Sequence, residues 1–394
     1  MNEIFYEEIK KNIYWVGVMD WSRKLFDSLI SLPQGTSYNA YLICGGEKNA
    51  LVDTVQSNFG EQLEKKINNI IELSSLDYVI MNHAEPDHAG SIPLILTKSN
   101  AVLITSEKGS KYAQLYYKVP VNRIKIVKDN EEISLGNKTL RFIDAPMLHW
   151  PETMFTYAIE DKVLFPCDFF GAHTAYGLYD SDNDELISYA KRYFGEIMMP
   201  FRTMGKRALE KISNLIIEMI APSHGCIYKN PEKIMPLYKE WNDGITKKKV
   251  IVIYATMWGS TARMIEQAIN ILMSEGIDTV IYDLSVADIG EIIKDLVDAR
   301  AAVIGAPTFL GSVHPLSLNA CYIIKLFKPA LQHTLLVSSY GWGPAAIKQI
   351  SEILSSLKIN IVGSVEVNGP PSEEDLSKVK EHAKKLAEII KYNK

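Results

Sequence analysis

The spacing of apolar residues changes near residue 245. Before that point, short apolar stretches such as residues 41–44 and 50–53 flank a tight turn at 45–48, and helical stretches such as 61–73 interrupt them. A mixture of short strands, tight turns and helices is typical of an α+β sandwich. We therefore predict an α+β sandwich for the first part of the chain.

From residue 250 onward, apolar runs and helical stretches alternate. The runs at 250–254, 279–282, 302–305, 335–338 and 360–363 are continuous, as in strands that are buried on both faces. Five strand–helix units predict an α/β fold with a doubly wound parallel five-stranded sheet. In such sheets ligands bind beyond the carboxyl ends of the strands, so the loops after the first, third and fourth strands are the expected binding loops.

The segment between the two patterns is rich in residues that favour turns. Prolines at 231 and 236 and the sequence Trp-Asn-Asp-Gly at 241–244 precede three lysines at 247–249, which we interpret as a solvated linker. The chain has 394 residues, well above the roughly 150 residues of one ordinary domain. We predict two domains, at residues 1–246 and 247–394.

Charge and composition exclude several classes of protein. The formal net charge of −5 gives no electrostatic footprint for nucleic acid. Residues 1–8 are acidic where a signal peptide would be basic, and no apolar run approaches the roughly 18 residues of a membrane span. The four cysteines are too scattered for a disulfide framework. We expect a cytoplasmic protein with no membrane or nucleic-acid partner.

Four possible metal ligands occur within six residues. Residues 83–88, with the sequence His-Ala-Glu-Pro-Asp-His, follow an apolar run at 77–81 and precede the loop 89–91. A strand that ends in a segment with proline and glycine presents side chains at a rigid edge, where a preorganised site needs little ordering. The ligand candidates in this segment are His83, Glu85, Asp87 and His88.

Three later candidates occupy similar positions. His149 follows the strand-like segment 139–144, Asp168 follows the apolar residues 162–167, and His224 follows the apolar stretch 215–222. Each of the three therefore lies near the end of an apolar stretch, as the first four do. Cys167 and Cys226 flank two of these positions, but small buried thiols are common, and we interpret both as packing residues.

A different kind of site is indicated by residues 256–261. This loop offers three hydroxyls and backbone amides at the start of a predicted helix, an arrangement that binds phosphate without a cation. It lacks the Gly-Lys-Ser ending of a Walker motif. The loops at 307–311 and 339–343 lie after the third and fourth predicted strands. The candidate cofactor-binding residues are Thr256, Met257, Trp258, Gly259, Ser260, Thr261, Pro307, Thr308, Phe309, Leu310, Gly311, Ser339, Tyr340, Gly341, Trp342 and Gly343.

The seven metal-ligand candidates resemble those of the metallo-β-lactamase superfamily, whose members hold two metals at one edge of an αββα sandwich. The usual motif of that superfamily is His-x-His-x-Asp-His, and Glu85 stands where the hydrolases have their second histidine. Glu85 replaces an imidazole with a hard anionic oxygen donor, and mixed shells with a bridging carboxylate suit iron better than zinc. The resemblance implies an αββα sandwich, and Glu85 favours iron redox chemistry over zinc hydrolysis.

The loop at 256–261 resembles the flavodoxin phosphate loop, with hydroxyl ligands at Thr256, Ser260 and Thr261. Residues 257–259 depart from the small and amide residues that are usual there. The resemblance implies FMN, whose isoalloxazine edge would meet the backbone of the two later loops. Phe309 or Trp342 could stack on the ring.

A diiron domain of the β-lactamase fold followed by a flavodoxin-like domain is the arrangement of the flavodiiron proteins, and the resemblance covers essentially the whole chain. It implies two non-haem irons, FMN, and reduction of dioxygen to water or of nitric oxide to nitrous oxide. By the family pattern, one iron is bound by His83, Glu85 and His149. The other is bound by Asp87, His88 and His224, and Asp168 bridges the two irons.

The resemblance also implies partners. A separate rubredoxin is the expected electron donor, with a reduced deazaflavin coenzyme as the alternative. A head-to-tail homodimer, with a dimer of dimers as a further option, would bring each flavin beside the irons of the partner chain. His173 and His314 are candidates for residues that contact the ligands of the proposed sites. Tyr176 or His173 could supply protons to the metal centre. Asp53 could orient a ligand imidazole or act as an ordinary turn carboxylate.

Two other functions remain open. A zinc hydrolase fused to a flavodoxin would explain residues 83–88 but would leave the flavin without a role, and Glu85 argues against it. A non-catalytic sensor of oxygen or nitric oxide could use the same centre. Neither the preferred gas nor the electron donor follows from the sequence.

Overall fold

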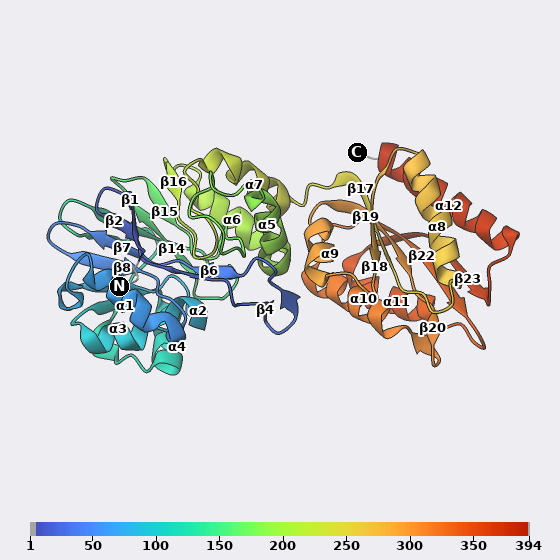
Figure 1. Ribbon diagram of the computed structural model, residues 1–394. Helices are drawn as coiled ribbons and strands as arrows, with labels where there is room; N and C mark the ends of the chain where they lie inside the picture. Colours follow the sequence, from blue (N-terminus) through green and yellow to red (C-terminus); the bar gives the residue numbers. More distant parts are fainter. Residues whose placement is uncertain (1–4, 393–394) are drawn as a thin grey trace. The chain divides into compact units, whose positions relative to one another are not determined.

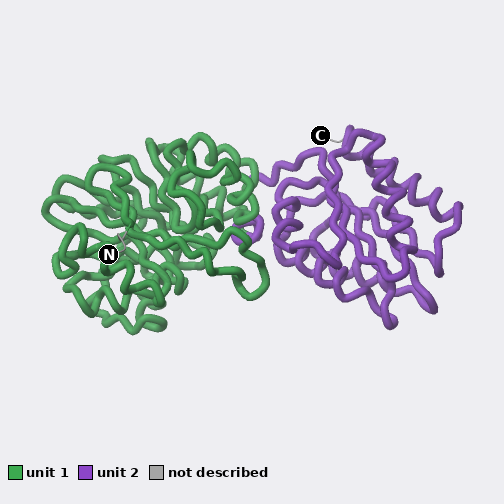
Figure 2. The backbone as a smooth tube through the Cα atoms, in the orientation of Figure 1, with its two compact units in different colours: residues 1–194, 201–242 green, residues 195–200, 243–394 purple. Residues whose placement is uncertain are grey.

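The computed structural model describes residues 5–392. The chain divides into two compact units (Figure 2). Unit 1 covers the residues up to 194 together with 201–242, and unit 2 covers 195–200 together with the residues from 243 onward. The two units are described separately below.

Unit 1 is built on two sheets (Figure 1). The seven-stranded sheet has the order β1-β2-β7-β8-β9-β10-β11, and the five-stranded sheet has the order β12-β13-β14-β15-β16. The first sheet consists of β1 (Glu7–Lys10), β2 (Ile13–Trp15), β7 (Tyr41–Cys44), β8 (Asn49–Val52), β9 (Tyr78–Ile80), β10 (Val102–Thr105) and β11 (Ile124–Ile126). The second consists of β12 (Glu132–Ser134), β13 (Thr139–Asp144), β14 (Met154–Ala158), β15 (Val163–Phe165) and β16 (Met219–Ile220).

Alternation of side chains along the strands explains the layers of unit 1. Successive side chains of a strand point to opposite faces of its sheet. Along β8, Ala50 and Val52 enter a core shared with Phe142 and Phe165 of the second sheet, whereas Leu51 enters a different core. That second core contains buried side chains from helices α1 (Gly60–Asn68), α3 (Ile92–Lys98) and α4 (Glu107–Tyr117). One face of the first sheet therefore packs on the second sheet and the other on helices.

An aromatic cluster covers the outer face of the second sheet. Phe155 of β14 stacks on Phe169 at 5.8 Å between ring centroids, and Phe169 contacts Tyr238 at 5.0 Å. Tyr238 belongs to α7 (Met235–Asp243), which lies with α5 (Leu186–Tyr193) and α6 (Arg202–Ile212) on this side of the strands (Figure 1). The predicted αββα sandwich is confirmed.

Two small ladders complete unit 1. Strand β3 (Val18–Asp20) pairs with β6 (Thr36–Tyr38), and β4 (Leu25–Phe26) pairs with β5 (Ile30–Ser31) in a hairpin. The helix predicted at 61–73 is shorter than expected, because α1 ends at Asn68. The Asn68 side chain then accepts a hydrogen bond from the backbone of Leu73 at 2.9 Å, which closes the turn.

Unit 2 is a parallel five-stranded sheet with the order β18-β17-β19-β22-β23. Val250 and Val252 of β17 pack with buried residues of helices α8 and α12. The predicted doubly wound sheet is confirmed. Its strands are β17 (Lys247–Tyr254), β18 (Asp278–Asp283), β19 (Ala299–Gly305), β22 (His333–Tyr340) and β23 (Asn360–Asn368), with a short hairpin of β20 (Thr308–Phe309) and β21 (Ser312–Val313). Its helices are α8 (Ser260–Ser274), α9 (Ile289–Leu296), α10 (Pro315–Phe327), α11 (Ala346–Leu354) and α12 (Glu373–Tyr392).

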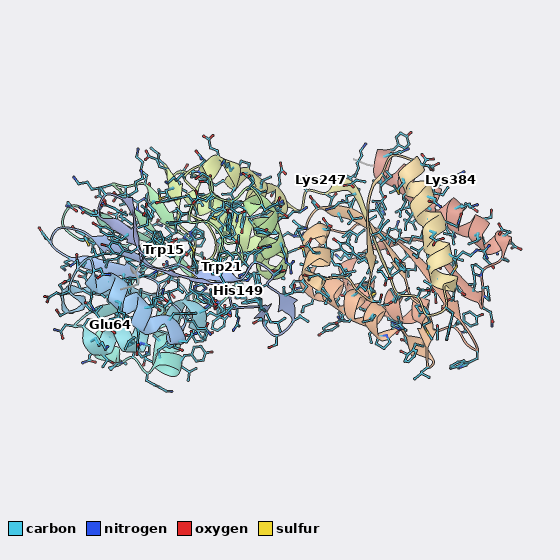
Figure 3. The ribbon with its side chains drawn as sticks, viewed as in Figure 1. Trp15, Trp21, Glu64, His149, Lys247 and Lys384 are labelled. Carbon is cyan, nitrogen blue, oxygen red and sulfur yellow. The ribbon has the colours of Figure 1, made fainter. Side chains whose placement is uncertain are left out.

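Two expectations about unit 2 are wrong. The strands at 279–282 and 360–363 were expected to be buried on both faces, but β18 and β23 lie at the sheet edges, and Ile281 and Ile361 are exposed. The three lysines at 247–249 were expected in a solvated linker, but they begin β17. Lys247, labelled in Figure 3, is exposed, whereas Lys249 is buried and pairs with Asp295 at 3.1 Å and with Asp298.

Membrane insertion has no support among the helices of residues 5–392, since none is both long and apolar enough to cross a bilayer.

Candidate metal centre and cofactor loops

The segment that follows β9 carries the first four metal-ligand candidates. β9 ends at Ile80, and His83 and Glu85 come next in an extended segment. The continuation was expected as a loop but forms a helical turn, α2 (Pro86–Ala89), which begins with Pro86 at a position where proline is favoured. This turn carries Asp87 and His88.

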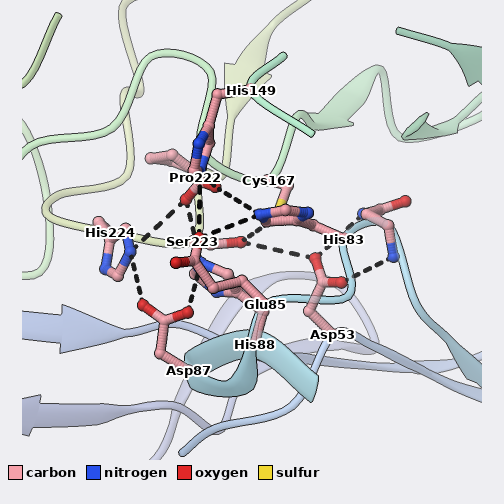
Figure 4. A network of polar contacts seen from close by, with 12 residues as sticks. Asp53, His83, Glu85, Asp87, His88, His149, Cys167, Pro222, Ser223 and His224 are labelled. Atoms are coloured by element: carbon pink, nitrogen blue, oxygen red, sulfur yellow. Dashed lines mark hydrogen bonds and ion pairs between the residues drawn. The ribbon is translucent and has the colours of Figure 1, made fainter. Parts of the chain in front are cut away.

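The first group of donor atoms comes from three segments, which follow β9, β13 and β15. Donor atoms of four residues lie within 4.8 Å of one another. The Glu85 carboxylate lies 3.2 Å from His83 Nε2 and 3.1 Å from His149 Nε2. Figure 4 shows these three side chains close together, with His83 and Glu85 from the segment after β9 and His149 from another loop. The fourth member is Asp168.

A second group lies directly beside the first. Donor atoms of Asp87, His88 and His224 also lie within 4.8 Å of one another. Asp87 Oδ2 is 3.3 Å from His224 Nε2, and Asp87 Oδ1 is 3.4 Å from His88 Nε2. The structure thus brings all seven predicted metal-ligand residues into two adjoining groups.

Asp168 connects the two groups through its two carboxylate oxygens. Oδ2 lies 3.5 Å from His83 Nε2 and 3.4 Å from His149 Nε2. Oδ1 lies 3.0 Å from His88 Nε2 and 3.5 Å from His224 Nε2. A carboxylate oriented in this way offers one oxygen to each group, as a ligand that bridges two metals must.

Hydrogen bonds fix the orientation of two of the imidazoles. His83 Nδ1 lies 2.8 Å from Glu152 Oε1, and His224 Nδ1 lies 2.6 Å from the carbonyl oxygen of Ser37. A carbonyl or carboxylate oxygen can only accept, so each Nδ1 carries a proton, and Nε2 is the nitrogen that faces the donor group and is left to bind a metal. The sequence analysis missed Glu152 and Ser37. The position of Glu152, three residues after the predicted ligand His149, could have indicated its role. No local sequence pattern indicates Ser37.

Asp53 supports the site indirectly, because among the described residues its hydrogen bonds are not made to a ligand imidazole. Its carboxylate accepts from the backbone N–H of Asn82 at 2.9 Å and from the Asn82 side-chain amide at 3.1 Å. Asn82 directly precedes His83, so this pair holds the start of the ligand segment. Asp53 is a turn carboxylate with a supporting role.

The site has unusual electrostatics for a protein interior. Although burial alone would lower it, hydrogen bonds to Glu152 and Glu85 raise the pKa of His83 to about 10. Although burial alone would raise it, His88 and His149 hold the pKa of the Asp168 carboxyl well below its usual value. Without a metal, the ionised carboxylates are therefore balanced by imidazolium charge, and a bound metal cation would displace the imidazole protons that face the group.

A cavity of about 170 Å³ opens beside the second group. Glu85, Asp87 and His224 reach it from the metal-ligand side. Asp27, in the hairpin of β4 and β5, and Arg23, just before it, line the other side and were not found from sequence. Nothing in the apolar pattern of that hairpin distinguished them.

Several accessory candidates are placed differently by the structure. His173 lines the cavity, and its Nδ1 lies 3.0 Å from Thr36 Oγ1, which also lies 3.2 Å from His224 Nδ1. Tyr176 is exposed. Tyr193, which the sequence analysis missed, donates its hydroxyl to Asp168 Oδ1 at 2.9 Å.

The cysteines near the site are protonated thiols. Burial raises the pKa of Cys167 well above its usual value, and Ser223 donates a hydrogen bond to its sulfur at 3.3 Å. Burial also raises the pKa of Cys226 to about 12. Since the thiolate is the form that binds metal, both residues are poor ligands.

The predicted cofactor loops of unit 2 border one cavity of about 410 Å³. Gly369 and Pro370, after β23, also line it and were missed because only three loops were considered. His314 caps α10, and its ring lies 5.7 Å from that of Phe309. The predicted residues that line the cavity are Met257, Trp258, Ser260, Thr308, Phe309, Leu310, Ser339, Tyr340, Gly341 and Trp342, whereas Thr256, Gly259, Thr261, Pro307, Gly311 and Gly343 do not line it.

Hydroxyls shape the first cofactor loop. The Thr256 hydroxyl accepts from the backbone N–H of Gly259 at 3.2 Å, and Thr261 and Ser339 share a hydrogen bond of 3.0 Å. Gly259 has a φ of +86°, a backbone conformation that side chains with a Cβ rarely adopt. Its lack of a side chain therefore permits the turn into α8.

The donor atoms of unit 1 fit the predicted metal ions, and the cavity of unit 2 fits the predicted FMN. Asp87 Oδ1, His88 Nε2 and Asp168 Oδ2 are buried without a hydrogen-bond partner among the described residues, a costly state unless a cation binds them. In unit 2, a Cβ on Gly341 would meet no atom within 4 Å and lies at the cavity wall, so the loop leaves room for a ligand. The cavity volume is also in the range of small-molecule sites.

Comparison with known proteins decides the family. Residues 36–225 match the family described as ODP family beta lactamase, and residues 252–382 match the flavodoxin family. The chain is 38% identical over 393 residues to a nitric oxide reductase of Moorella thermoacetica, covering 97% of this chain and 98% of the relative. The chain belongs to the flavodiiron family.

Solved structures of flavodiiron proteins share the whole architecture. Rubredoxin oxygen:oxidoreductase from Desulfovibrio gigas superposes with a TM-score of 0.95 at 27% identity, covering 98% of this chain and 99% of that one. The flavodiiron protein of Giardia intestinalis superposes with a TM-score of 0.92 at 27% identity, covering 98% and 97%. As a member of this family the chain is an oxidoreductase whose cofactors are FMN and a non-haem diiron pair.

Proposed function

We propose that this chain reduces dioxygen to water, nitric oxide to nitrous oxide, or both, at two irons held by the seven clustered side chains. His83, Glu85 and His149 would hold one iron. Asp87, His88 and His224 would hold the other, with Asp168 bridging. The observation that carries the proposal is the orientation of Asp168, whose oxygens face the two groups separately.

The protein's own part in the reaction is to prepare the donors and the space. Bound irons would supply Lewis acidity and electrons to a diatomic gas. Glu152 and Ser37 keep His83 and His224 in the tautomer that presents Nε2. The cavity beside the second group is far smaller than a drug-sized pocket, so it suits a gas better than an ester or lactam substrate.

Electron counting supports pairing this centre with the flavin. Reduction of dioxygen to two waters takes four electrons, and a pair of ferrous ions and one fully reduced FMN supply two each. We propose residues 1–246 as the diiron domain and 247–394 as the FMN domain. His173, which lines the cavity, and Tyr176 are proposed as proton sources, and replacement by Asn or Phe with unchanged turnover would contradict this.

The test is anaerobic metal and flavin analysis of the purified protein, followed by mixing of the fully reduced form with measured dioxygen or nitric oxide. We expect two irons and one FMN per chain and rapid reoxidation without peroxide. The faster of the two gases is the preferred substrate. Zinc in place of iron, with ester or thioester hydrolysis, would contradict the proposal in favour of a hydrolase. A stable gas adduct with slow turnover would contradict it in favour of a sensor.

We also propose a head-to-tail homodimer in which the flavin of one chain serves the irons of the other, with a dimer of dimers as a further option. Exposed apolar side chains near both sites support this proposal. Trp21, Leu25 and Leu29 lie in and beside the hairpin that borders the metal-side cavity, and Trp258 and Trp342 border the cofactor cavity. Clusters of exposed apolar residues commonly mark interfaces.

Mixed dimers provide a direct test of electron transfer between chains. A His88→Ala variant, which lacks a metal ligand, would be mixed with a variant whose cofactor cavity is filled by Gly341→Trp. Transfer between chains predicts that mixing restores turnover that neither variant has alone. Transfer within one chain predicts no restoration, and sedimentation of the wild type as a fully active monomer would also contradict the dimer.

The electron donor is proposed to be a separate rubredoxin, with a reduced deazaflavin coenzyme as the alternative. The Desulfovibrio relative, which carries rubredoxin in its name, supports the first option. We also propose a cytoplasmic location, because four free thiols suit a reducing compartment. Reduction of the bound FMN by each donor in stopped flow would distinguish them.

A further inference from the structure

A line of aromatic rings leads from the metal-ligand side chains to the surface of unit 1. The Trp150 ring lies 5.1 Å from the His83 ring and 6.4 Å from the His149 ring, measured between centroids. On its other side, Trp150 lies 6.0 Å from Tyr112 and 6.3 Å from Tyr116. Trp150 therefore contacts two proposed ligands of the same iron and two tyrosines.

The two tyrosines form the outer end of this line. They are four residues apart on α4, a spacing that places both on one face of the helix. Their rings stack at 5.5 Å with an angle of 12° between planes. The Tyr116 side chain is 48% exposed, so its phenol can release a proton to water.

Two other aromatic rings near the metal centre, those of Tyr193 and Phe26, each lack one property that an electron path to the surface needs. Tyr193 donates its hydroxyl to Asp168 but is only 2% exposed, so its phenol does not reach water directly. Phe26 lies 5.0 Å from His173, but a phenyl ring is much harder to oxidise than an indole or a phenol. The line through Trp150 combines contact with the ligands, oxidisable rings and an exposed end.

We propose that Trp150, Tyr112 and Tyr116 form a protective electron path, which supplies electrons to the metal centre when the flavin cannot. This inference rests on the proposed function. Complete reduction of dioxygen takes four electrons and four protons, and two of the electrons come from the metal pair. If FMN is oxidised, two electrons are missing at the centre while the gas is already bound.

The proposed step balances these electrons. Tyr116 and Tyr112 each lose one electron, which passes through Trp150 to the metal centre, and each loses its phenolic proton. Two neutral phenoxyl radicals remain on the helix surface. The two electrons and two protons, with two more protons from water, complete the formation of two water molecules. The oxidative damage is thereby moved from the metal ligands to the partly buried Tyr112 and the exposed Tyr116, and an external reductant can reach Tyr116.

The experiment uses the full chain with iron and FMN bound. The protein is reduced anaerobically with two electron equivalents per chain, fewer than dioxygen needs, and is then mixed with dioxygen and a nitroso spin trap. Peptide mass spectrometry locates the trapped radicals, and oxygen consumption is recorded in the same samples. We expect adducts on Tyr112 and Tyr116 in the wild type. Oxygen consumption without adducts at these residues would overturn the inference and leave the proposed function intact.

Variants separate the path from nonspecific oxidation. Trp150→Phe keeps an aromatic ring but removes the oxidisable one, so adducts on both tyrosines should be lost, with new oxidation on His83 or His149. Tyr116→Phe should shift the adduct to Tyr112. Tyr6→Phe is the matched control, since Tyr6 is also exposed and its ring neighbour is Tyr14 at 6.5 Å; the adducts should not change. Unchanged adducts in Trp150→Phe would overturn the inference.

Two further samples test the inference if Trp150→Phe loses iron or if the protein does not reduce dioxygen. If Trp150→Phe fails to bind iron, the double variant Tyr112→Phe with Tyr116→Phe replaces it, and radicals that still form elsewhere on α4 would overturn the path. If the protein reduces only nitric oxide, hydrogen peroxide replaces dioxygen, with iron-depleted protein as the control. Adducts on the two tyrosines that require iron support the path, and adducts that form equally without iron overturn it.

Discussion

Two groups of buried or partly buried carboxylates, one in each unit, are balanced in different ways. In unit 2, Asp295 and Asp298 face the ammonium of Lys249, and Tyr282 donates a further hydrogen bond to Asp295 at 2.5 Å. In unit 1, the Asp168 carboxylate faces four imidazoles at 3.0 to 3.5 Å. The first group is built around an ammonium, which cannot bind a metal, whereas the second is built around imidazoles, which can exchange a proton for a metal cation.

The difference shows how a metal site can be distinguished from a structural ion pair. A buried carboxylate is stable when a charged partner and hydrogen bonds satisfy it. The group around Lys249 meets the first part of this condition with an ammonium, which lies 3.1 Å from Asp295 and pairs with Asp298. The group around Asp168 has no such ammonium, and it leaves Asp87 Oδ1, Asp168 Oδ2 and both ring nitrogens of His88 without hydrogen-bond partners among residues 5–392. Four predictions test this comparison.

The largest effect is expected from Asp168→Ala. Removal of the carboxylate that faces both groups should release iron and lower turnover by more than about 100-fold, since loss of even an outer partner of a ligand can cost that much. Iron content per chain and steady-state gas consumption measure the effect. Asp184→Ala, at an exposed position, is the control and should retain both irons. Full iron content in Asp168→Ala would contradict the bridging role.

The second prediction concerns the group around Lys249. Lys249→Ala removes the buried ammonium from the partly buried Asp295 and from Asp298, which keeps its ion pair with the exposed Lys247 at 3.2 Å. The free energy of unfolding should fall, but by less than the about 3 to 5 kcal/mol that a fully unpaired buried charge costs. Denaturant unfolding followed by FMN release reports on unit 2. Lys248→Ala, exposed on the same strand, should change the free energy of unfolding by less than about 0.5 kcal/mol. Equal effects of the two variants would remove the contrast drawn above.

A smaller effect is expected from Glu152→Gln. The amide oxygen can still accept from Ala84, but it no longer places a negative charge on His83 Nδ1–H, so metal affinity should fall about 10- to 100-fold. Competition with a chelator measures the affinity. Glu107→Gln is the control, because Glu107 is exposed at the start of α4. An unchanged affinity would mean that Glu152 only packs against the site.

The smallest effects are expected in two of the cofactor loops, at Gly259 and at Gly341. Gly259→Ala forces a Cβ into a left-handed backbone conformation, which should lower the stability of unit 2 by about 1 to 2 kcal/mol. Gly341→Ala has no such strain and should weaken FMN binding without affecting the stability of the flavin-free protein. Thermal unfolding of that form and a flavin fluorescence titration measure the two quantities. Loss of stability in both variants would contradict this division.

Much of this architecture was predictable from local sequence. The metal ligands lie just after apolar strands, and this shared position at strand ends indicated that His83, after β9, and Asp168, after β15, belong to a site. Residues that support the ligands are ordinary side chains far away in the sequence. Ser37 contacts a histidine 187 residues later, and no local pattern distinguishes it.

The errors have a common physical cause. The apolar run at 279–282 resembles an interior strand, but burial of a strand depends on its place in the sheet, and β18 lies at the edge. Three consecutive lysines resemble a solvated linker, but the partner of Lys249 lies 46 residues away on the end of α9. Strand order and distant ion pairs are properties of the folded chain that a local pattern does not contain.

The hydrogen bond from Tyr193 to Asp168 is made to Oδ1, the oxygen that faces His88 and His224. One half of the shared carboxylate is therefore a weaker base than the other. The donor sets differ as well, since Glu85 belongs to one group and Asp87 to the other. Two irons bound there would occupy chemically distinct positions, and Mössbauer spectra of the diferrous protein should show two resolved quadrupole doublets of equal area.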